Sequence, residues 1–494
     1  MSYISLSLYF AAMIGIGVYG YKTASKDISD YVLGGRKVGP KVTALSAGAS
    51  DMSGWMLMGL PGAMFVMGFD AILIAVGLLM GALANYILVA PRLRVFTENA
   101  DNALTIPAFF SKRFKRDTGT LRLLSAAVIV VFFTLYTSAG LVAGGKLFVS
   151  AFDASYTMGV VVTLAIVVLY TLLGGFLAVS TTDFVQGCIM FVALVMVPVV
   201  AFFQFDSVEQ VASSAFTSIP AFSESIRDIT LITLVSSLAW GLGYFGQPHI
   251  IVRFMAIKSV KDIPTAKSFG MSWMLVTILG ALATGFIGVA YVNNFGLVLS
   301  DPETIFIRFT EVLFHPLISG FLLAAVLAAI MSTISSQLLV SASSLTEDIY
   351  RAFHNKNLGN KQTVIIGRLG VAGVAIVALL LALRGDSSIL SLVSNAWAGF
   401  GAAFGPLILF SLYYSRLTYA GAISGVVSGA IAVLVCIYVP LLVDGNTISD
   451  VMYELVPGFA ISSITIFLVS HFTAGPSRAV ESLYQQSSKL VSEQ

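Results

Sequence analysis

Long apolar runs recur along the whole chain and are separated by short polar segments. Each run has about 18 to 25 residues, which is enough for an α-helix to cross a hydrocarbon core about 30 Å thick. The pattern therefore predicts an all-α polytopic membrane protein whose main solvent is lipid. Thirteen spans are expected, at residues 3–21, 43–66, 70–91, 123–149, 157–178, 184–205, 229–250, 268–293, 314–341, 364–383, 389–413, 418–440 and 456–474.

The basic residues between these spans are distributed unevenly. If the N-terminus lies outside the cell, the alternate segments that face the cytoplasm hold 23 of the 27 Lys and Arg residues. Basic residues concentrate in the cytoplasmic loops of membrane proteins. This bias predicts an external N-terminus and, because the number of spans is odd, a cytoplasmic C-terminus. The segments expected in the cytoplasm are 22–42, 92–122, 251–267, 342–368, 414–417 and the tail 475–494.

Composition excludes a separate soluble domain. The chain is 57% hydrophobic and 11% charged, with a mean hydropathy of +0.92, whereas a soluble protein has about 25% charged residues. Residues 1–494 are therefore expected to form a single membrane domain. Cys188 and Cys436 lie within apolar runs and the histidines are scattered, so neither a disulfide framework nor a metal centre is expected. The first run lacks a cleavage site and is interpreted as a retained span.

Two of the predicted spans are poor continuous helices. The second contains Ser-Asp-Met-Ser-Gly at 50–54, followed by two glycines and a proline, and the seventh contains three glycines and a proline at 241–248. Gly and Pro free backbone polar groups, which membranes tolerate only where these groups are buried or line a cavity. Matching interrupted helices in two halves of a chain indicate a transporter's binding site. The pattern predicts two inverted five-span repeats, at 43–205 and 229–413.

Asp51 is the strongest single candidate for a functional residue, because it lies within the interrupted second span. A carboxylate inside a span costs about 2.5–3.5 kcal/mol on the insertion scale and usually faces a cation, a partner or a cavity. We interpret Asp51 as a group required for cation coupling, with Ser50 and Ser53 as polar neighbours. The alternative is a carboxylate that only caps the helix end at the interruption.

The ninth span offers oxygen ligands for a cation. Ala329, Ser332 and Thr333 stand at positions i, i+3 and i+4, which places one carbonyl and two hydroxyls on the same helix face. Ser335 and Ser336 extend this polar patch. Small hydroxyl residues in membrane helices more often serve helix packing. The patch therefore indicates a sodium site only in combination with the interrupted helix.

A second carboxylate, Asp183, comes at the expected start of the sixth span. Asp is favoured at helix N-termini, where it accepts backbone hydrogen bonds, and this structural role is a sufficient explanation by itself. The functional alternative is an inner cation site, in which Asp183 is joined by the hydroxyls of Ser332, Ser335 and Ser336.

In the seventh span, Trp240, Tyr244 and Pro248 repeat every four residues around the interruption. On a regular helix this spacing presents two aromatic rings and a kink to one side. An aromatic stripe usually serves core packing, but here it coincides with freed backbone N–H groups that can meet a carboxylate. We therefore expect a substrate pocket that Trp55 and Tyr136 help to close.

Four stretches of the chain resemble the sodium:solute symporter family, most closely its bacterial sodium/proline branch, and the resemblance extends to about residue 475. It implies a LeuT-like fold of thirteen helices with a ten-helix inverted-repeat core. It also implies sodium as the coupling ion, L-proline as the substrate and the bacterial inner membrane as the location. The stretches are TALSAGASDMSGWMLMGLPG at 43–62, WGLGYFGQPHI at 240–250, AAIMSTISSQLLV at 328–340 and AWAGFGAAFGP at 396–406.

The same resemblance implies roles for particular residues. Asp51 is the carboxylate that sodium coupling needs, Asp183 lies near the ion exit, and Arg36 in a cytoplasmic loop affects coupling. The main sodium site comprises the backbone of Ala49 and Met52 together with Ala329, Ser332 and Thr333. The proline pocket comprises Ser53, Gly54, Trp55, Tyr136, Trp240, Tyr244 and Pro248.

Two positions depart from the family pattern. Thr181 stands where Trp is expected, which can alter ion release, and Ser336 stands where Cys is expected, which makes a two-sodium stoichiometry conceivable. The substrate is also open to an alternative, because a fold does not fix what is bound. Another amino acid, pantothenate or a sugar would fit the same family. A channel would need a continuous polar pore and an enzyme would need a catalytic constellation, and neither pattern is found in the sequence.

Overall fold

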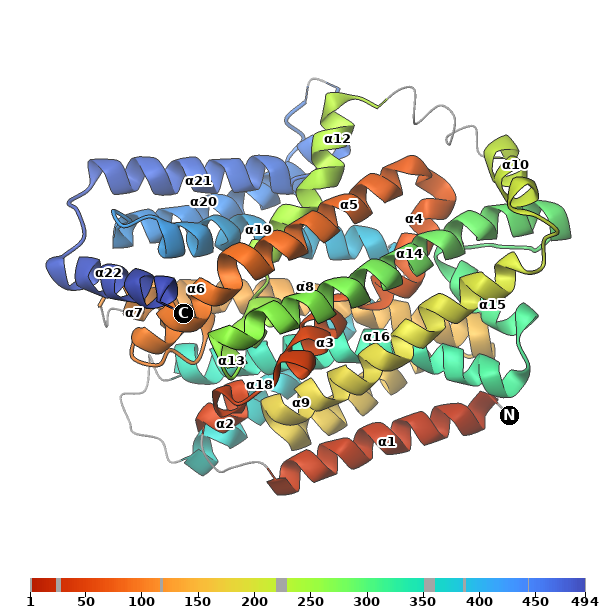
Figure 1. Cartoon of the computed structure of the whole chain (residues 1–494), viewed down its shortest axis with the longest axis horizontal. Coiled ribbons are helices and arrows are strands. Elements are labelled where there is room, and N and C mark those ends of the chain that lie inside the picture. Colours follow the sequence, from red (N-terminus) through yellow and green to blue (C-terminus); the bar gives the residue numbers. More distant parts are fainter. Residues whose placement is uncertain are drawn as a thin grey trace.

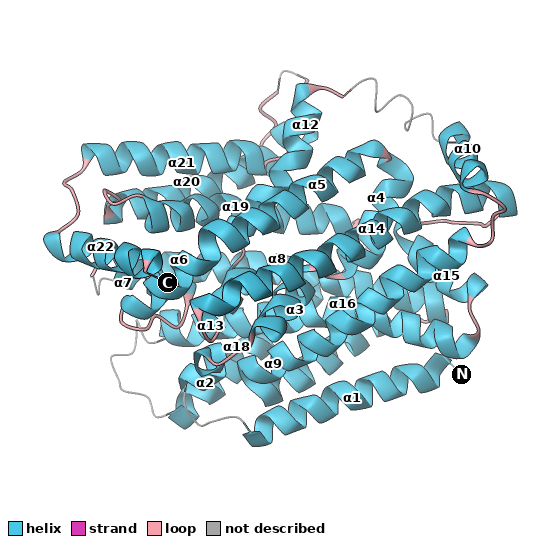
Figure 2. Ribbon diagram, viewed as in Figure 1, coloured by secondary structure: helices cyan, strands magenta, loops and turns pink. Residues whose placement is uncertain are grey.

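The computed structural model describes residues 2–23, 28–115, 119–218, 229–350, 360–384, 388–442 and 444–493. Within these ranges the chain forms helices joined by loops (Figure 2), and no strand is present apart from an isolated bridge between Val38 and Ile257. The predicted all-α fold is confirmed.

The helices follow the predicted spans, and short helices appear between several of them. Their bounds are α1 Ser2–Thr23, α2 Ile28–Leu33, η1 Gly34–Arg36, α3 Pro40–Asp51, η2 Trp55–Gly59, α4 Leu60–Met67, α5 Phe69–Ala84, η3 Asn85–Val89, α6 Ala90–Asn99, α7 Ile106–Arg113, α8 Thr120–Phe152, α9 Tyr156–Phe202, α10 Val208–Ser218, α12 Leu231–Leu238, η4 Ala239–Gly246, α13 Pro248–Ala256, η5 Val260–Asp262, α14 Ile263–Phe295, η6 Pro302–Thr304, α15 Ile305–Leu313, α16 Pro316–Ser343, η7 Ser344–Tyr350, α18 Asn360–Ala382, α19 Ile389–Tyr413, α20 Tyr419–Tyr438, η8 Ile448–Asp450, α21 Leu455–Phe472 and α22 Arg478–Ser492.

Among the described residues, nine helices are long and apolar enough to cross a membrane by length and composition. Shorter apolar helices occupy the places of the first, second, fifth and seventh predicted spans. They cover Ile4–Tyr19, Trp55–Met67, Tyr156–Leu172 and Leu231–Gly246. The polytopic membrane fold is thus confirmed, while the total of thirteen spans stays a prediction.

Two helices form the centre of the molecule. Helix α16 packs against α1, α8 and α9, and α19 packs against η4, α8, α20 and α21. They are the most deeply buried of the long apolar helices. In Figure 1 most helices run along the long axis, with α1 at the lower edge and α20 and α21 at the upper left. The interrupted helices contact both central helices, since α3 packs on α16 and η4 packs on α19.

The structure contains both predicted interruptions. Helix α3 ends at Asp51, and residues 52–53 leave the helical path before helix resumes at Gly54 and η2 begins. Helix α12 gives way to the 3-10 helix η4, and the chain is extended at Gln247 before α13 restarts at Pro248. Glycine is required in η4 at Gly243, where an added Cβ would overlap Nε1 of the Trp397 indole ring. The two inverted repeats remain a prediction.

Two boundaries differ from the sequence prediction. The fifth and sixth spans meet at Gly175, whose φ of 61° and ψ of −166° break α9, and helix resumes at once. Asp183 therefore lies well inside the second part of α9, and its predicted place at a helix N-terminus is wrong. The seventh span continues through the apolar helix α13 to Ala256. Arg253, which the sequence placed in a cytoplasmic loop, is buried.

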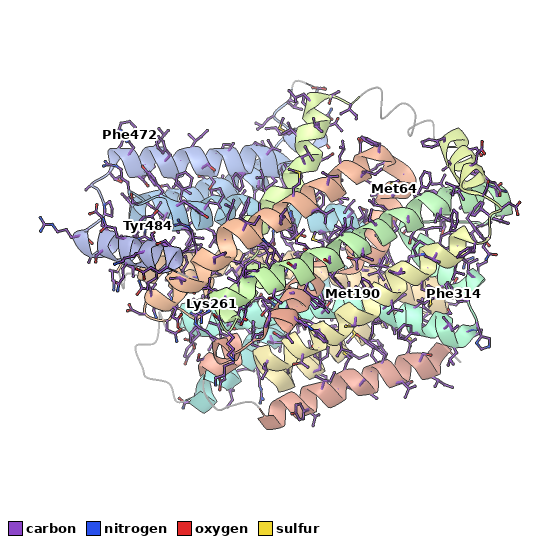
Figure 3. All side chains as sticks on the ribbon, in the orientation of Figure 1. Met64, Met190, Lys261, Phe314, Phe472 and Tyr484 are labelled. Carbon is purple, nitrogen blue, oxygen red and sulfur yellow. The ribbon has the colours of Figure 1, made fainter. Side chains whose placement is uncertain are left out.

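Segments predicted to lie on the same side of the membrane gather at one end of the molecule. In Figure 3, Lys261 and Tyr484 lie toward the left end, whereas Met64 and Phe314 lie toward the right. The two termini also lie toward opposite ends of the long axis (Figure 1). The predicted tail contains the helix α22, which packs on α6. This separation agrees with an odd number of spans.

Candidate ion and substrate site

Helix α3 meets the middle of α16 through a group of oxygen atoms. Ser332 Oγ donates a hydrogen bond to the carbonyl oxygen of Ala49 at 2.7 Å, and Thr333 Oγ1 lies 3.4 Å from the same oxygen. Ser332 Oγ is also 3.0 Å from the carbonyl oxygen of Ala329. All four residues are buried. We call them the Ala49 cluster. Four of the five residues predicted to bind sodium are therefore joined in space.

Met52, the fifth predicted sodium ligand, has other contacts. Its N–H donates to the carbonyl oxygen of Gly48 at 2.8 Å, and its Sδ accepts from Thr277 Oγ1 at 3.6 Å. Within the described ranges, no hydrogen bond joins Met52 to the Ala49 cluster. Its part in sodium binding thus stays a prediction.

The predicted pocket residues that follow Asp51 lie together at the interruption. Trp55 Nε1 donates to the carbonyl oxygen of Asp51 at 2.9 Å, which stabilises the unwound segment. Tyr136 on α8 lies close to the side chains of Ser53 and Trp55, and its buried hydroxyl has no hydrogen-bond partner among the described residues. Gly54 allows this close approach, since a Cβ there would lie 2.7 Å from the Ala143 Cβ on α8.

The carboxylate of Asp51 is hydrogen-bonded to η4 and not to the residues of the Ala49 cluster. Its Oδ2 accepts a hydrogen bond from the Tyr244 hydroxyl on η4, and its Oδ1 has no partner among the described residues. Asp51 is the last residue of α3, at the negative end of the helix dipole, where a carboxylate is unfavourable. It accepts a side-chain hydroxyl here rather than a backbone N–H. The structure therefore does not support the interpretation of Asp51 as a simple helix cap.

Asp183 is paired with a buried guanidinium that the sequence analysis did not anticipate. Arg253 Nη2 lies 3.1 Å from Asp183 Oδ2, and the same guanidinium group donates to the hydroxyls of Ser336 and Ser46. Ser46 Oγ donates to Asp183 Oδ2 at 2.7 Å. Both charged side chains are at most 1% exposed. The positive charge beside Asp183 is therefore supplied by Arg253.

This ion pair changes the prediction of a second sodium site. Of the four proposed ligands, Asp183 and Ser336 contact Arg253, while Ser332 belongs to the Ala49 cluster. Ser335 Oγ donates to the carbonyl oxygen of Ser332 at 3.0 Å. The predicted four-oxygen shell is therefore divided between two sets of contacts. Thr181 is exposed and bonded to its own helix at Leu177.

Trp240, Tyr244 and Pro248 do not share one face, contrary to the sequence prediction. Trp240 lines a cavity of about 610 Å³ and Tyr244 a cavity of about 30 Å³ beside Asp51. Pro248 lines a third cavity of about 20 Å³. The reason is local geometry, because η4 is a 3-10 helix with about three residues per turn. A spacing of four residues then no longer brings side chains to the same side.

Aromatic residues from η4, from α19 and from the loop between η8 and α21 lie between the large cavity and the interior. Trp240 stacks on Tyr453, with ring centroids 5.1 Å apart and an interplanar angle of 19°. Trp397 on α19 donates its Nε1–H to the carbonyl oxygen of Trp240 at 2.8 Å. Its ring meets Tyr244 edge-on at 5.0 Å. Trp240 and Tyr453 thus line the large cavity, while Tyr244 contacts both Trp397 and Asp51.

Arg36 is not free in a loop but joins three segments. Its guanidinium group donates to Asn102 Oδ1 at 2.8 Å, to Thr97 Oγ1 at 3.2 Å, and to the carbonyl oxygens of Met255 and Ala103 at 2.6 and 2.9 Å. Burial lowers the pKa of the guanidinium to about 10, so it remains charged at neutral pH. Arg36 thus ties the end of α13 to the segment after α6.

The sequence profile of the sodium:solute symporter family matches residues 31–429. The chain belongs to the sodium:solute symporter family. It is 55% identical over 492 residues to the osmoregulated proline transporter OpuE of Bacillus subtilis, covering 99% of this chain and 98% of that protein. It is 52% identical over 487 residues to a sodium/proline symporter of Staphylococcus aureus, and the match covers 97% of this chain and 94% of that protein.

Solved structures share the fold of this symporter. A sodium-coupled sialic acid symporter in a substrate-bound outward-open state superposes with a TM-score of 0.79 at 20% identity, covering 97% of this chain and 99% of that chain. MhsT in complex with L-phenylalanine gives a TM-score of 0.53 at 13% identity, and the superposition covers 87% of this chain and 98% of that chain. The coupling ion of the family is sodium, whose preferred ligands are hard oxygens such as those of the Ala49 cluster.

Several residues at the symporter's site were missed by sequence reasoning. Arg253 was missed because the seventh span was ended too early, although the run HIIVRFMA remains apolar around one charge. Such a charge inside a span is by itself a functional signal. Trp397 lies in a recognised stretch but received no role. Tyr453 and Asn85 carry no signal that distinguishes them in one sequence.

Proposed function

We propose that this symporter imports L-proline together with sodium by alternating access across the plasma membrane of a bacterium. The observation that carries the proposal is the Ala49 cluster, where the end of an interrupted helix meets hydroxyls of α16 beside a buried carboxylate. The choice of proline is supported by the relatives that share more than half of their residues with this chain.

Sodium binding at the Ala49 cluster would link two helices. The hydroxyls of Ser332 and Thr333 now point at the carbonyl oxygen of Ala49. An ion among these oxygens would be bound by all of them at once and would hold α3 against α16. The conformation of the C-terminal end of α3 would then depend on whether sodium is bound. We propose that proline binds next to this interruption, between Ser53, Gly54, Trp55 and Tyr136, so that each ligand favours binding of the other.

We propose that the N-terminus is periplasmic or extracellular and the C-terminus cytoplasmic. The cavity of about 610 Å³ would then open to the outside. Asp70, Asp450 and Glu454 are among its lining residues, and no Lys or Arg of the described chain lines it. Hydrogen bonds from Thr447 lower the pKa of Asp450, so its carboxylate stays ionised. The resulting negative potential would raise the local sodium concentration.

Trp240→Ala is expected to raise the half-saturating proline concentration about tenfold, which corresponds to about 1.4 kcal/mol. The substitution removes the stack on Tyr453 that closes the large cavity, and it should admit bulkier solutes. Trp240→Phe, which retains a ring, serves as the matched control. Initial rates of labelled proline uptake in proteoliposomes measure both. Unchanged proline kinetics in Trp240→Ala would remove Trp240 from the substrate path.

One positive charge is expected to enter with each proline. The charge of Asp183 is balanced by Arg253. Asp51 is then the buried carboxylate at the ion and substrate site whose charge a bound cation would balance. A potential of 100 mV then contributes about 2.3 kcal/mol per charge, or roughly 50-fold accumulation. The measurement is the ratio of charge flux to proline flux, in the wild type and in Ser336→Ala. We expect a charge-to-proline ratio of one in both proteins. A ratio of two in the wild type would support the second sodium site at Asp183 and Ser336.

The substrate assignment is tested by competition. Labelled proline uptake driven by a sodium gradient is measured in the presence of excess unlabelled amino acids, pantothenate or sugars. We expect proline to compete fully, and the other solutes to compete weakly. Full inhibition by another solute, with weak self-competition by proline, would assign the symporter to that solute instead.

A further inference from the structure

A small cavity lies on a face of α3 that does not carry Ala49. Ala44, Gly48 and Asp51 line it, and their spacing of four and three residues places them on one face of the helix. Ala49 follows Gly48 by one position and points about 100° away. The remaining walls come from α5, η3, η4, α13 and α14, and the volume is about 30 Å³.

Three polar atoms of the cavity-lining residues lack partners. They are Asp51 Oδ1 and both side-chain atoms of Asn85, Oδ1 and Nδ2, for which the described residues offer no hydrogen bond. Asp51 is 2% exposed and Asn85 is 1% exposed. Buried polar groups in proteins are nearly always hydrogen-bonded to protein, water or an ion. The unpaired carboxylate oxygen and amide therefore point to an occupant of this cavity.

The volume restricts the occupant. One water molecule needs about 10–15 Å³ of such space, whereas organic ligands occupy pockets of about 300–1,000 Å³. The cavity thus has room for two water-sized particles and none for an amino acid. An ion with one water of hydration fits these dimensions.

The negative charge of the Asp51 carboxylate restricts the occupant of the cavity further. Among the described residues, no Lys or Arg side chain forms an ion pair with Asp51, in contrast to Asp183, which is paired with Arg253. The carboxylate also stands at the negative end of α3. The accepting atoms offered by Asp51, Asn85 and Tyr244 are oxygens, which suit a hard cation. A water bound to that cation can accept the N–H of the Asn85 amide.

We infer that Asp51 and Asn85 form a second position for the coupling sodium ion, separate from the Ala49 cluster. The inference rests on the proposed sodium-coupled function and adds Asn85 on η3 as an ion ligand. The two positions lie on different faces of one helix, and Asp51 at the end of that helix is a buried carboxylate without a cationic partner among the described residues. The ion therefore occupies them in turn, and the stoichiometry remains one sodium per proline.

The test measures sodium binding to the purified full-length protein in the absence of proline. The readout is the change in melting temperature as the sodium concentration is raised. Asn85→Leu, which keeps the size but removes both polar atoms, is expected to raise the half-saturating sodium concentration roughly tenfold, as loss of one polar partner does at other metal sites. Asn85→Asp adds a charge and is expected to lower it. Asn294→Leu, the same change at the exposed end of α14, should leave it unchanged.

The outcomes separate this inference from the proposed function. If Asn85→Leu melts at a higher temperature without sodium and keeps the wild-type sodium dependence, the cavity holds no ion and the inference is overturned while sodium symport stands. If Asn85→Leu does not fold, Asn85→Asp decides, because an unchanged sodium dependence there also overturns the inference. A wild-type protein that shows no response to sodium at all would overturn the inference and the proposed function together.

Discussion

Asp51→Asn is expected to raise the sodium concentration for half-maximal proline uptake by roughly 100-fold, or about 2.8 kcal/mol. The substitution removes the charge but keeps the shape and the oxygen that accepts from the Tyr244 hydroxyl. Folding should therefore change little. Because sodium and substrate affinities are reciprocally linked, the apparent proline affinity at low sodium should fall as well.

Initial uptake rates over a range of sodium concentrations measure this effect. Asp101→Asn is the matched control, because Asp101 is exposed and lines neither the large cavity nor the cavity beside Asp51. It should show nearly wild-type sodium activation. If Asp51→Asn inserts normally into the membrane and retains wild-type sodium activation, Asp51 has no role in coupling and serves only the local structure.

Arg253→Gln is expected to destabilise the protein by about 3–5 kcal/mol, because it leaves a buried carboxylate without its charged partner. Asp183 would retain the hydrogen bond from Ser46 but lose its positively charged partner. The double variant Arg253→Gln with Asp183→Asn removes both charges and should recover a large part of the loss. Lys489→Gln, at an exposed ion pair with Glu493, is the control and should have almost no effect.

Thermal unfolding of the purified variants in detergent measures the difference. If the single and double variants melt at the same temperature, the two charges are not coupled.

The Arg253→Gln variant also tests the second sodium site predicted from sequence. Removing Arg253 frees Asp183 and Ser336 for a cation, so sodium should stabilise Arg253→Gln more than it stabilises the wild type.

The sequence was sufficient for the general architecture, because lipid imposes strong rules on a chain. Apolar length predicted the spans, and Gly and Pro at 50–62 and 241–248 predicted the interruptions in α3–α4 and α12–α13. The polar positions of α16 were also informative. Ala329, Ser332 and Thr333 share a helix face, so their meeting with the carbonyl oxygen of Ala49 required only that α3 pack on α16.

The errors arose where local geometry or a distant partner decides. A spacing of four residues places Trp240 and Tyr244 together only on an α-helix, and η4 is a 3-10 helix. Asp183 was interpreted from an assumed loop, whereas the break at Gly175 needs no loop. Its partner Arg253 lies 70 residues away in sequence. One sequence contains no information on which buried charges will pair across such a separation.

The most direct test of sodium–proline symport is accumulation of labelled proline in proteoliposomes that contain the purified protein. An inward sodium gradient is compared with an equal potassium gradient, with the membrane potential clamped to zero and then set to 100 mV, negative inside. We expect accumulation only with sodium, and an increase of roughly 50-fold from the potential. Equal accumulation in potassium, or no effect of the potential, would contradict electrogenic sodium–proline symport.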